Sequence, residues 1–352
     1  MKRKTVMLIA GLLALVLAAE AQIGGNSTYG FLNLTHAARI ASLGGKTVAI
    51  NDNDLNLAMY NPSLLNASMH NHFALNYIDY FAGIHFGYAS YAYRYDEKNT
   101  FAAGIQYINY GTFDKAEATG ELTGKFYAGE SALCLMYAHA LDSNFSLGVN
   151  FKPVYSTLES YTSFGLAADA GIHYTDDERL FTAALLVRNA GTQIKRYTPV
   201  SGYEPLPFEV VAGFSHKMKY APFRIVVTAQ QLQRLRLTYV DSAKAQIDPL
   251  TGQIVRPSRM TDLAENFMRH VILGVEFLPL KNFYFRVGYN YMRRKELQIP
   301  ERVGAVGFSW GFGLRIRKIN LAYGRSSYHL AGGTNHFTLS LNLSEFYRKK
   351  II

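Results

Sequence analysis

One short stretch of the chain resembles a catalytic motif. Gly307-Phe308-Ser309-Trp310-Gly311 matches the G-x-S-x-G pattern of serine hydrolases, in which the serine sits on a sharp turn between a strand and a helix. The residues on either side of this stretch instead alternate between apolar and small residues with a period of two. That alternation predicts that Ser309 lies inside a β-strand and that the glycines give room to whatever packs beside them. The motif is therefore not expected to be catalytic.

The acidic stretch Asp52-Asn53-Asp54 could begin a calcium-binding loop, but the glycine and closing glutamate of such a loop are missing. Helix capping or an ion pair with Arg39 is the expected role of these carboxylates. The ten histidines show no metal-ligand spacing, and the single cysteine, Cys134, cannot form an intrachain disulfide. We therefore expect no cofactor, no metal site and no enzymatic activity.

Strict alternation of apolar and polar residues recurs along most of the chain. It is clearest in four stretches: His336 to Ser344, Asn282 to Tyr291, Phe145 to Lys152 and Phe223 to Gln230. A period of two is typical of a β-strand with one apolar and one polar face. The chain also contains 25 Tyr and 22 Phe but one Trp, an aromatic content that suits a lipid-facing barrel and also a large soluble sandwich.

The N-terminus has the three parts of an export signal. Lys2 to Lys4 are basic, Val6 to Ala18 form a short apolar core, and Ala19-Glu20-Ala21 provides the small residues that a signal peptidase recognises. We therefore expect a signal peptide at residues 1–21 and a mature protein that begins at Gln22. The apolar core is shorter than the roughly 20 residues that a membrane-spanning helix needs.

Fourteen alternating stretches predict fourteen strands. Their expected spans are His72 to Asp79, Ala82 to Tyr95, Thr100 to Tyr110, Gly124 to His139, Asn144 to Thr157, Tyr161 to Tyr174, Leu180 to Asn189, Glu204 to His216, Ala221 to Gln231, Met268 to Leu278, Asn282 to Met292, Arg302 to Ile316, Arg317 to Arg325 and Asn335 to Ser344. The links after even-numbered strands are short and most of the others are longer, up to the loop from Leu232 to Phe267. Outer-membrane barrels have short periplasmic turns and long outer loops, whereas a soluble sandwich has no reason to separate loop lengths in this way.

The expected fold is therefore an all-β transmembrane antiparallel barrel at residues 72–352, in the outer membrane of a Gram-negative bacterium. Residues 22–71 differ in composition and contain two helix-like pieces, Thr35 to Ser42 and Asp54 to Tyr60. Because side chains alone fill a barrel only near eight strands, we expect this segment to plug the lumen. The net charge of +10 fits contact with anionic lipid or an acidic partner, and no motif indicates nucleic-acid binding.

The order of motifs in residues 22–71 resembles the plug of FadL-type outer-membrane proteins. The residues that carry this resemblance are Arg39, Gly44, Gly45, Asp52, Asp54, Asn61 and Pro62. In that superfamily an Asn-Pro-Ala motif ends the plug, and here Ser63 replaces the alanine. The resemblance implies a structural role for these residues.

The whole mature chain is also similar to the PorQ family of the type IX secretion system of Bacteroidetes. The similarity rests on Leu43-Gly44-Gly45, Asn61 to Leu65, Asn76 to Gly83, Tyr107 to Phe113 and Glu345 to Lys350. It implies a non-catalytic barrel that anchors a surface partner of the attachment complex, a PorZ-like protein, near the PorU sortase and the PorV barrel. The alternative is a FadL-type channel for hydrophobic small molecules. A plugged lumen with an apolar loop rim would favour anchoring. An opening in the barrel wall beside a displaced strand, together with an apolar pocket above the plug, would favour transport.

Overall fold

The computed structural model describes residues 27–200, 202–238, 259–280, 282–298, 304–329 and 332–347. The expected signal peptide, the first residues of the mature chain and positions 239–258 of the longest loop lie outside the described residues. None of the helices in the described ranges is long and apolar enough to cross a membrane.

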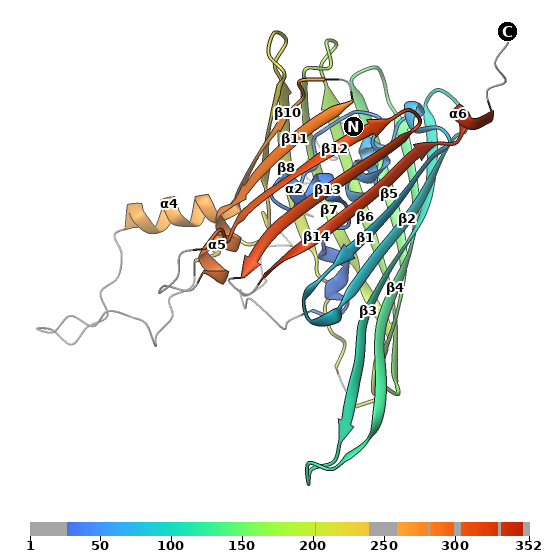
Figure 1. Cartoon of the computed structure of the whole chain (residues 1–352), viewed down its shortest axis with the longest axis vertical. Helices are drawn as coiled ribbons and strands as arrows, with labels where there is room; N and C mark the ends of the chain where they lie inside the picture. The colour runs from blue at the N-terminus through green and yellow to red at the C-terminus, as the bar shows by residue number, and fades with distance from the viewer. Residues whose placement is uncertain are drawn as a thin grey trace, which may run out of the picture.

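Fourteen antiparallel strands form one closed barrel, in which each strand pairs with the next and β1 pairs with β14 (Figure 1). The strands are β1 (His72–Asp79), β2 (His85–Arg94), β3 (Asn99–Ala116), β4 (Leu122–Ala140), β5 (Phe145–Leu158), β6 (Tyr161–Thr175), β7 (Phe181–Lys195), β8 (Glu209–Lys217), β9 (Phe223–Ala229), β10 (Val271–Phe277), β11 (Phe283–Asn290), β12 (Phe308–Ile316), β13 (Ile319–His329) and β14 (Gly332–Asn342). The predicted fold class and strand number are confirmed.

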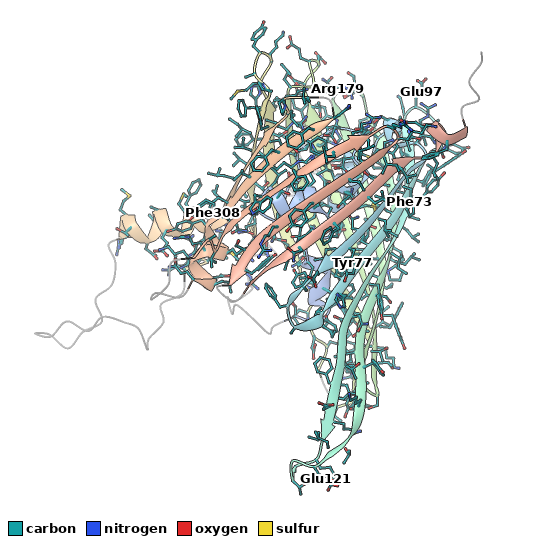
Figure 2. The ribbon with its side chains drawn as sticks, in the orientation of Figure 1. Phe73, Tyr77, Glu97, Glu121, Arg179 and Phe308 are labelled. Carbon is teal, nitrogen blue, oxygen red and sulfur yellow. The ribbon has the colours of Figure 1, made fainter. Side chains whose placement is uncertain are left out.

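The connections at one end of the barrel, which we call the turn end, have no more than five residues each, and every longer connection lies at the other end, the loop end. Figure 2 shows Glu97 and Arg179 at the turn end and Glu121 at the far tip of the β3–β4 hairpin. Closed barrels of this kind place their tight turns on the periplasmic side.

The wall is much taller on one side than on the other. β3 and β4 have 18 and 19 residues, whereas β9 and β10 have 7 each. The sequence prediction ended β3 at Tyr110, but the strand continues to Ala116 and pairs with β4 up to Leu122. β7 likewise runs to Lys195 instead of Asn189. Beyond the membrane both faces of a strand can be polar, so the alternation that marks a strand disappears while the backbone pairing continues.

Two helices at the loop end replace structure that the sequence predicted as loop or strand. α4 (Arg259–His270) lies in the expected loop and takes in Met268, which was expected in a strand. α5 (Tyr291–Leu297) follows β11 directly, because the side chain of Asn290 accepts the backbone N–H of Arg293 and so caps a helix. At the turn end a short helix, α6 (Ser344–Tyr347), follows β14.

The outward face of the wall is apolar and the inward face is polar or small. Phe337 is 48 % exposed and Val287 is 41 % exposed, whereas the neighbouring Thr338 and Arg286 are buried. Figure 2 labels two side chains that are exposed on the outward face, Tyr77 of β1 and Phe308 of β12. An apolar band of this extent on a closed barrel is the surface that meets lipid, so the chain is a transmembrane β-barrel.

Residues 28–71, which we call the luminal segment, lie inside the barrel (Figure 1, blue). The segment contains the short helices α2 (Ala38–Ser42) and α3 (Leu55–Tyr60), and its remaining turns are single 3-10 turns. Ile40 and Leu57 are fully buried and belong to one apolar cluster with Leu186 and Val211 of the wall. The segment therefore shares a core with the strands.

Candidate functional site: the lumen and its loop-end pocket

Glycines of the wall let the luminal segment approach the strands closely. A Cβ atom on Gly148 of β5 would lie 2.2 Å from the carbonyl carbon of Pro62, and one on Gly288 of β11 would lie 2.2 Å from the backbone nitrogen of Gly44. Both distances are far inside van der Waals contact, so no other residue fits at these positions without moving the segment. The inward-facing glycines thus mark where the segment rests.

The Gly44-Gly45 pair ends α2 with two residues at positive φ, +96° and +97°, a conformation that glycine adopts without strain. The N–H of Gly44 donates to Oγ of Ser309 at 3.0 Å, and that hydroxyl donates to the backbone oxygen of Ser42 at 3.1 Å. Ser309 is the second residue of β12, and the strand, not a helix, continues from it to Ile316. The serine of the G-x-S-x-G stretch therefore ties the luminal segment to the wall.

Arg39 of α2 is the centre of a buried charge cluster near the turn end. Its guanidinium group reaches Asp52 at 2.8 Å, Asp54 at 3.2 Å and the buried Glu276 of β10 at 2.8 Å. Glu276 also binds Arg224 of β9 at 2.7 Å and Arg286 of β11 at 2.6 Å. The cluster pairs three arginines with three carboxylates, so its net charge is zero.

The ion pairs keep the carboxylate of Asp52 ionised, although its side chain is only 27 % exposed. Burial alone would raise the pKa of Asp52, but Arg39 and Arg224 outweigh it and lower that pKa below its usual value. Sequence analysis brought Arg39, Asp52 and Asp54 together but missed Glu276, Arg224 and Arg286. A signal was present, since all three occupy inward positions of alternating strands, and Glu276 is the cross-strand neighbour of both arginines.

The Asn61-Pro62 motif forms a second attachment, on the opposite side of the lumen. The Asn61 side chain donates to the backbone oxygen of Val48 at 2.8 Å and accepts the N–H of Ser63 at 3.1 Å. A Cβ atom on Gly171 of β6 would lie 2.3 Å from the side-chain oxygen of Asn61. Asn61 thus holds two turns of the luminal segment together where they meet the wall.

A second set of buried charges, which the sequence analysis did not identify, surrounds this attachment. Lys152 of β5 binds Asp169 of β6 at 2.6 Å and the side chain of Asn189. Arg188 of β7 lies 4.0 Å over the ring of Tyr60 and donates to the backbone oxygen of Leu32. These groups also fix the luminal segment to the wall.

The pockets at the turn end are lined mainly by polar groups. One of about 410 Å³ borders the Arg39 cluster and is also lined by Asn53, His72 and Lys318. Among the described residues no group of three His, Cys, Asp or Glu side chains has metal-binding geometry. These pockets provide no surface suited to an apolar ligand.

A pocket of different character lies at the loop end, above the luminal segment, and has a volume of about 590 Å³. Its lining includes the side chains of Tyr29, Tyr110, Phe113, Phe126, Leu158 and Tyr197. The rings of Phe113 and Phe126 stack with their centroids 5.3 Å apart.

The tyrosine hydroxyls and the Glu130 carboxylate of this pocket are already bonded within the protein, whereas Glu204, which also lines it, is exposed. The hydroxyl of Tyr110 donates to Glu130, and the hydroxyl of Tyr197 donates to Ser156 at 2.6 Å. The sequence analysis missed this pocket. The pairing of β3 with β4 shifts register between Asn109 and Thr112, so a simple alternation does not tell which side chains turn inward beyond that point.

No protein-family model matches the sequence, and no curated protein matches it. Solved structures do match. A mutant of the TodX monoaromatic hydrocarbon channel superposes with a TM-score of 0.50 at 12 % identity, over 88 % of this chain and 97 % of that one. A FadL homologue from Pseudomonas aeruginosa gives a TM-score of 0.49 at 11 % identity, over 88 % and 98 % of the two chains. The structural neighbours are outer-membrane barrels of the FadL type. At this level of identity the likeness concerns the fold.

Proposed function

We propose that the protein is a channel in the outer membrane of a Gram-negative bacterium that takes up small apolar compounds from the cell surface. The observation that carries this proposal is the aromatic pocket at the loop end. Its volume of about 590 Å³ lies within the range of roughly 300–1,000 Å³ that is usual for small-molecule sites. Neighbours in fold include a toluene transporter from P. putida, which is consistent with the proposal.

The chemistry of the lining favours an apolar ligand over an anionic one. Stacked phenyl rings offer dispersion contacts and an apolar surface. The carboxylate of Glu130 and the nearby tyrosine hydroxyls are occupied by bonds to other protein groups. None of the described residues that line the pocket is Lys or Arg, so an anionic ligand would lose its hydration without gaining a partner, which is costly.

The way out of the pocket is sideways rather than down the lumen, since the luminal segment fills the space below. β2 begins at His85, opposite Asn109, so the edge of β3 from Tyr110 to Ala116 has no partner on that side. The eight residues of β1, tilted by about 40°, rise roughly 20 Å, less than the roughly 25 Å of the apolar band. The wall formed by β1 and β2 is therefore lower than the apolar band. A compound in the pocket leaves over the loop-end edge of these two strands and enters the membrane.

Uptake measured with variants of the pocket tests the proposal. F113D and F126D place a carboxylate in the lining, and Y127D is the matched control because Tyr127 is the next residue of the same strand and is 70 % exposed. With the fluorescent apolar probe 1-N-phenylnaphthylamine, we expect F113D and F126D to slow uptake into cells that express the protein, and Y127D to leave it unchanged. Equal rates of probe uptake for F113D, F126D and Y127D would contradict the proposal that the protein is a channel with this binding pocket.

The anchoring role in type IX secretion, with a PorZ-like protein and the PorU and PorV components in a member of the Bacteroidetes, is a second candidate. One observation favours it, namely the β3–β4 hairpin, which extends beyond the barrel and exposes Leu122 near its tip (Figure 1). Co-purification of a tagged protein from native envelope tests this candidate. Shortening the hairpin should release the surface partner into the medium and leave probe uptake unchanged.

A further inference from the structure

Helix α4 turns its polar face toward the protein. Asp262 pairs with Arg236 at 2.9 Å, and the side chain of Asn266 bonds to the backbone of both Leu235 and Leu237. Arg269 donates to the backbone oxygen of Leu237. A surface helix of a soluble domain packs its apolar face against the core, so α4 has the opposite orientation.

The apolar face of α4 is consequently exposed. Met260 is 77 % exposed, Leu263 65 % and Phe267 66 %. They follow the spacing i, i+3, i+7, which places them on one side of the helix. Leu235, beside the helix, is 73 % exposed. An apolar patch of this kind on a folded protein marks a contact with lipid or with another molecule.

The level of α4 on the barrel indicates which contact this is. β10 follows α4 directly, and its seven residues, tilted by about 40°, rise roughly 18 Å from the turn end of the sheet. The apolar band of such a barrel is roughly 25 Å tall, so the C-terminal end of α4, where the helix joins β10, lies just inside the outer boundary of the band. Figure 1 shows α4 projecting sideways from the loop end of the wall.

The exposed face is also continuous with the lipid-facing wall. Leu273 and Val275 of β10, the strand that α4 leads into, point outward and are exposed. Arg259, the first residue of α4, is exposed, as is Lys295 of α5, which lies 3.9 Å from Glu265 of α4, and both cations can meet lipid phosphates.

We propose that α4 is an interfacial helix that lies in the outer leaflet, with Met260, Leu263 and Phe267 among the acyl chains. The helix fixes the depth of the short wall of the barrel in the membrane. A protein partner at this face is the competing explanation, and it would have to enter the membrane interface beside the barrel. The proposal does not depend on what the channel transports.

Tryptophan fluorescence in vesicles of brominated phosphatidylcholine tests the proposal. Trp310 is the only tryptophan, and it points outward from β12. It is therefore the positive control, and its quenching establishes that the barrel is inserted. The test protein carries F267W with W310F. The negative control carries E121W with W310F, since Glu121 is at the tip of the β3–β4 hairpin, away from the wall (Figure 2).

With acyl chains brominated near the headgroup, we expect F267W to be quenched about twofold, since interfacial helices sink roughly 5–10 Å into this boundary. E121W should not be quenched. If Trp310 is quenched and F267W behaves like E121W, the proposal is wrong and the face is left for a protein partner. L263W on the same face gives a second reading, so a folding defect of one variant does not decide the result.

Discussion

The two ends of the lumen are built from different chemistry. At the turn end the luminal segment is attached to the wall by the Arg39 cluster, in which Glu276 is fully buried and bonded to three arginines. At the loop end the same segment contributes Tyr29 to a pocket of aromatic rings whose tyrosine hydroxyls are bonded to other protein groups. One end is fixed by paired charges, and the other presents apolar surface to its surroundings.

This difference separates closure of the lumen from ligand binding. Buried ion pairs are costly to break one partner at a time, so the turn end opens only at the expense of several kcal/mol. The aromatic pocket needs no such change, because its lining is already in place and faces the cell exterior. A compound can therefore bind at the loop end while the turn end stays closed.

The largest expected effect follows from removing the charge at the centre of the Arg39 cluster. E276Q leaves three buried arginines with two carboxylates, and loss of one partner of a buried pair typically costs about 3–5 kcal/mol. We expect the free energy of unfolding in urea, measured on the barrel in lipid, to fall by that amount. Proteolysis within the luminal segment should become faster.

An exposed ion pair at the same end is the control for this prediction. Glu178 and Lys219 lie 2.9 Å apart and both side chains are more than half exposed. Solvent screens such pairs, so E178Q should leave the free energy of unfolding unchanged within error. Equal effects of E276Q and E178Q would mean that the charge cluster does not hold the turn end.

The strands were predictable because each one obeys a local rule. Alternation places Phe285 and Phe337 outside and Arg286 inside, and the structure confirms each of these positions. The ends of the strands were less predictable. Alternation is visible only where the two faces of a strand differ in polarity. That difference is lost where β3 passes beyond the membrane. α4 was missed although Met260, Leu263 and Phe267 have the helical spacing i, i+3, i+7, because only three apolar residues carry that pattern and they lie within a long loop.

The contacts of the Arg39 cluster were predictable only between residues that are close in sequence. Arg39 lies within 15 residues of Asp52 and Asp54, and the three are bonded in the structure. Glu276 is 237 residues from Arg39, and its contact depends on how the barrel closes around the segment. Lys152 and the aromatic pocket depend on register in the same way, so no local pattern in the sequence reveals them.

A smaller effect is expected from His36, which is fully buried in the luminal segment. Burial lowers its pKa to about 4, helped by the nearby charges of Arg188 and Lys152. In the detached segment the usual pKa of about 6.5 applies. The detached state therefore takes up the proton first, and attachment weakens as the pH falls from about 6.5 to 4, by up to about 3 kcal/mol.

Hydrogen exchange in residues 28–71 across this pH range measures that loss. H36Q is the matched variant, since glutamine can keep the donation to the backbone oxygen of Asn56 but does not titrate. Its protection should fall less than that of the unaltered protein between pH 6.5 and 4, apart from the intrinsic pH dependence of exchange, since His173, whose ring bonds to Asn51 of the segment, remains in both proteins. Asp52 adds a loss only at lower pH, because its pKa is lowered below its usual value. A parallel decline in both proteins would rule out His36 as the cause.

The smallest expected effect tests whether the two ends work independently. Asn51 of the luminal segment bonds to Thr175 of β6, with 3.0 Å between the amide nitrogen and the hydroxyl oxygen. A disulfide between N51C and T175C, in a C134A background, would lock the luminal segment to the wall. If compounds leave the pocket sideways, oxidation should leave uptake of 1-N-phenylnaphthylamine unchanged relative to the reduced protein. Loss of uptake on oxidation, restored by a reductant, would show that the segment must move and that the lumen itself is the path.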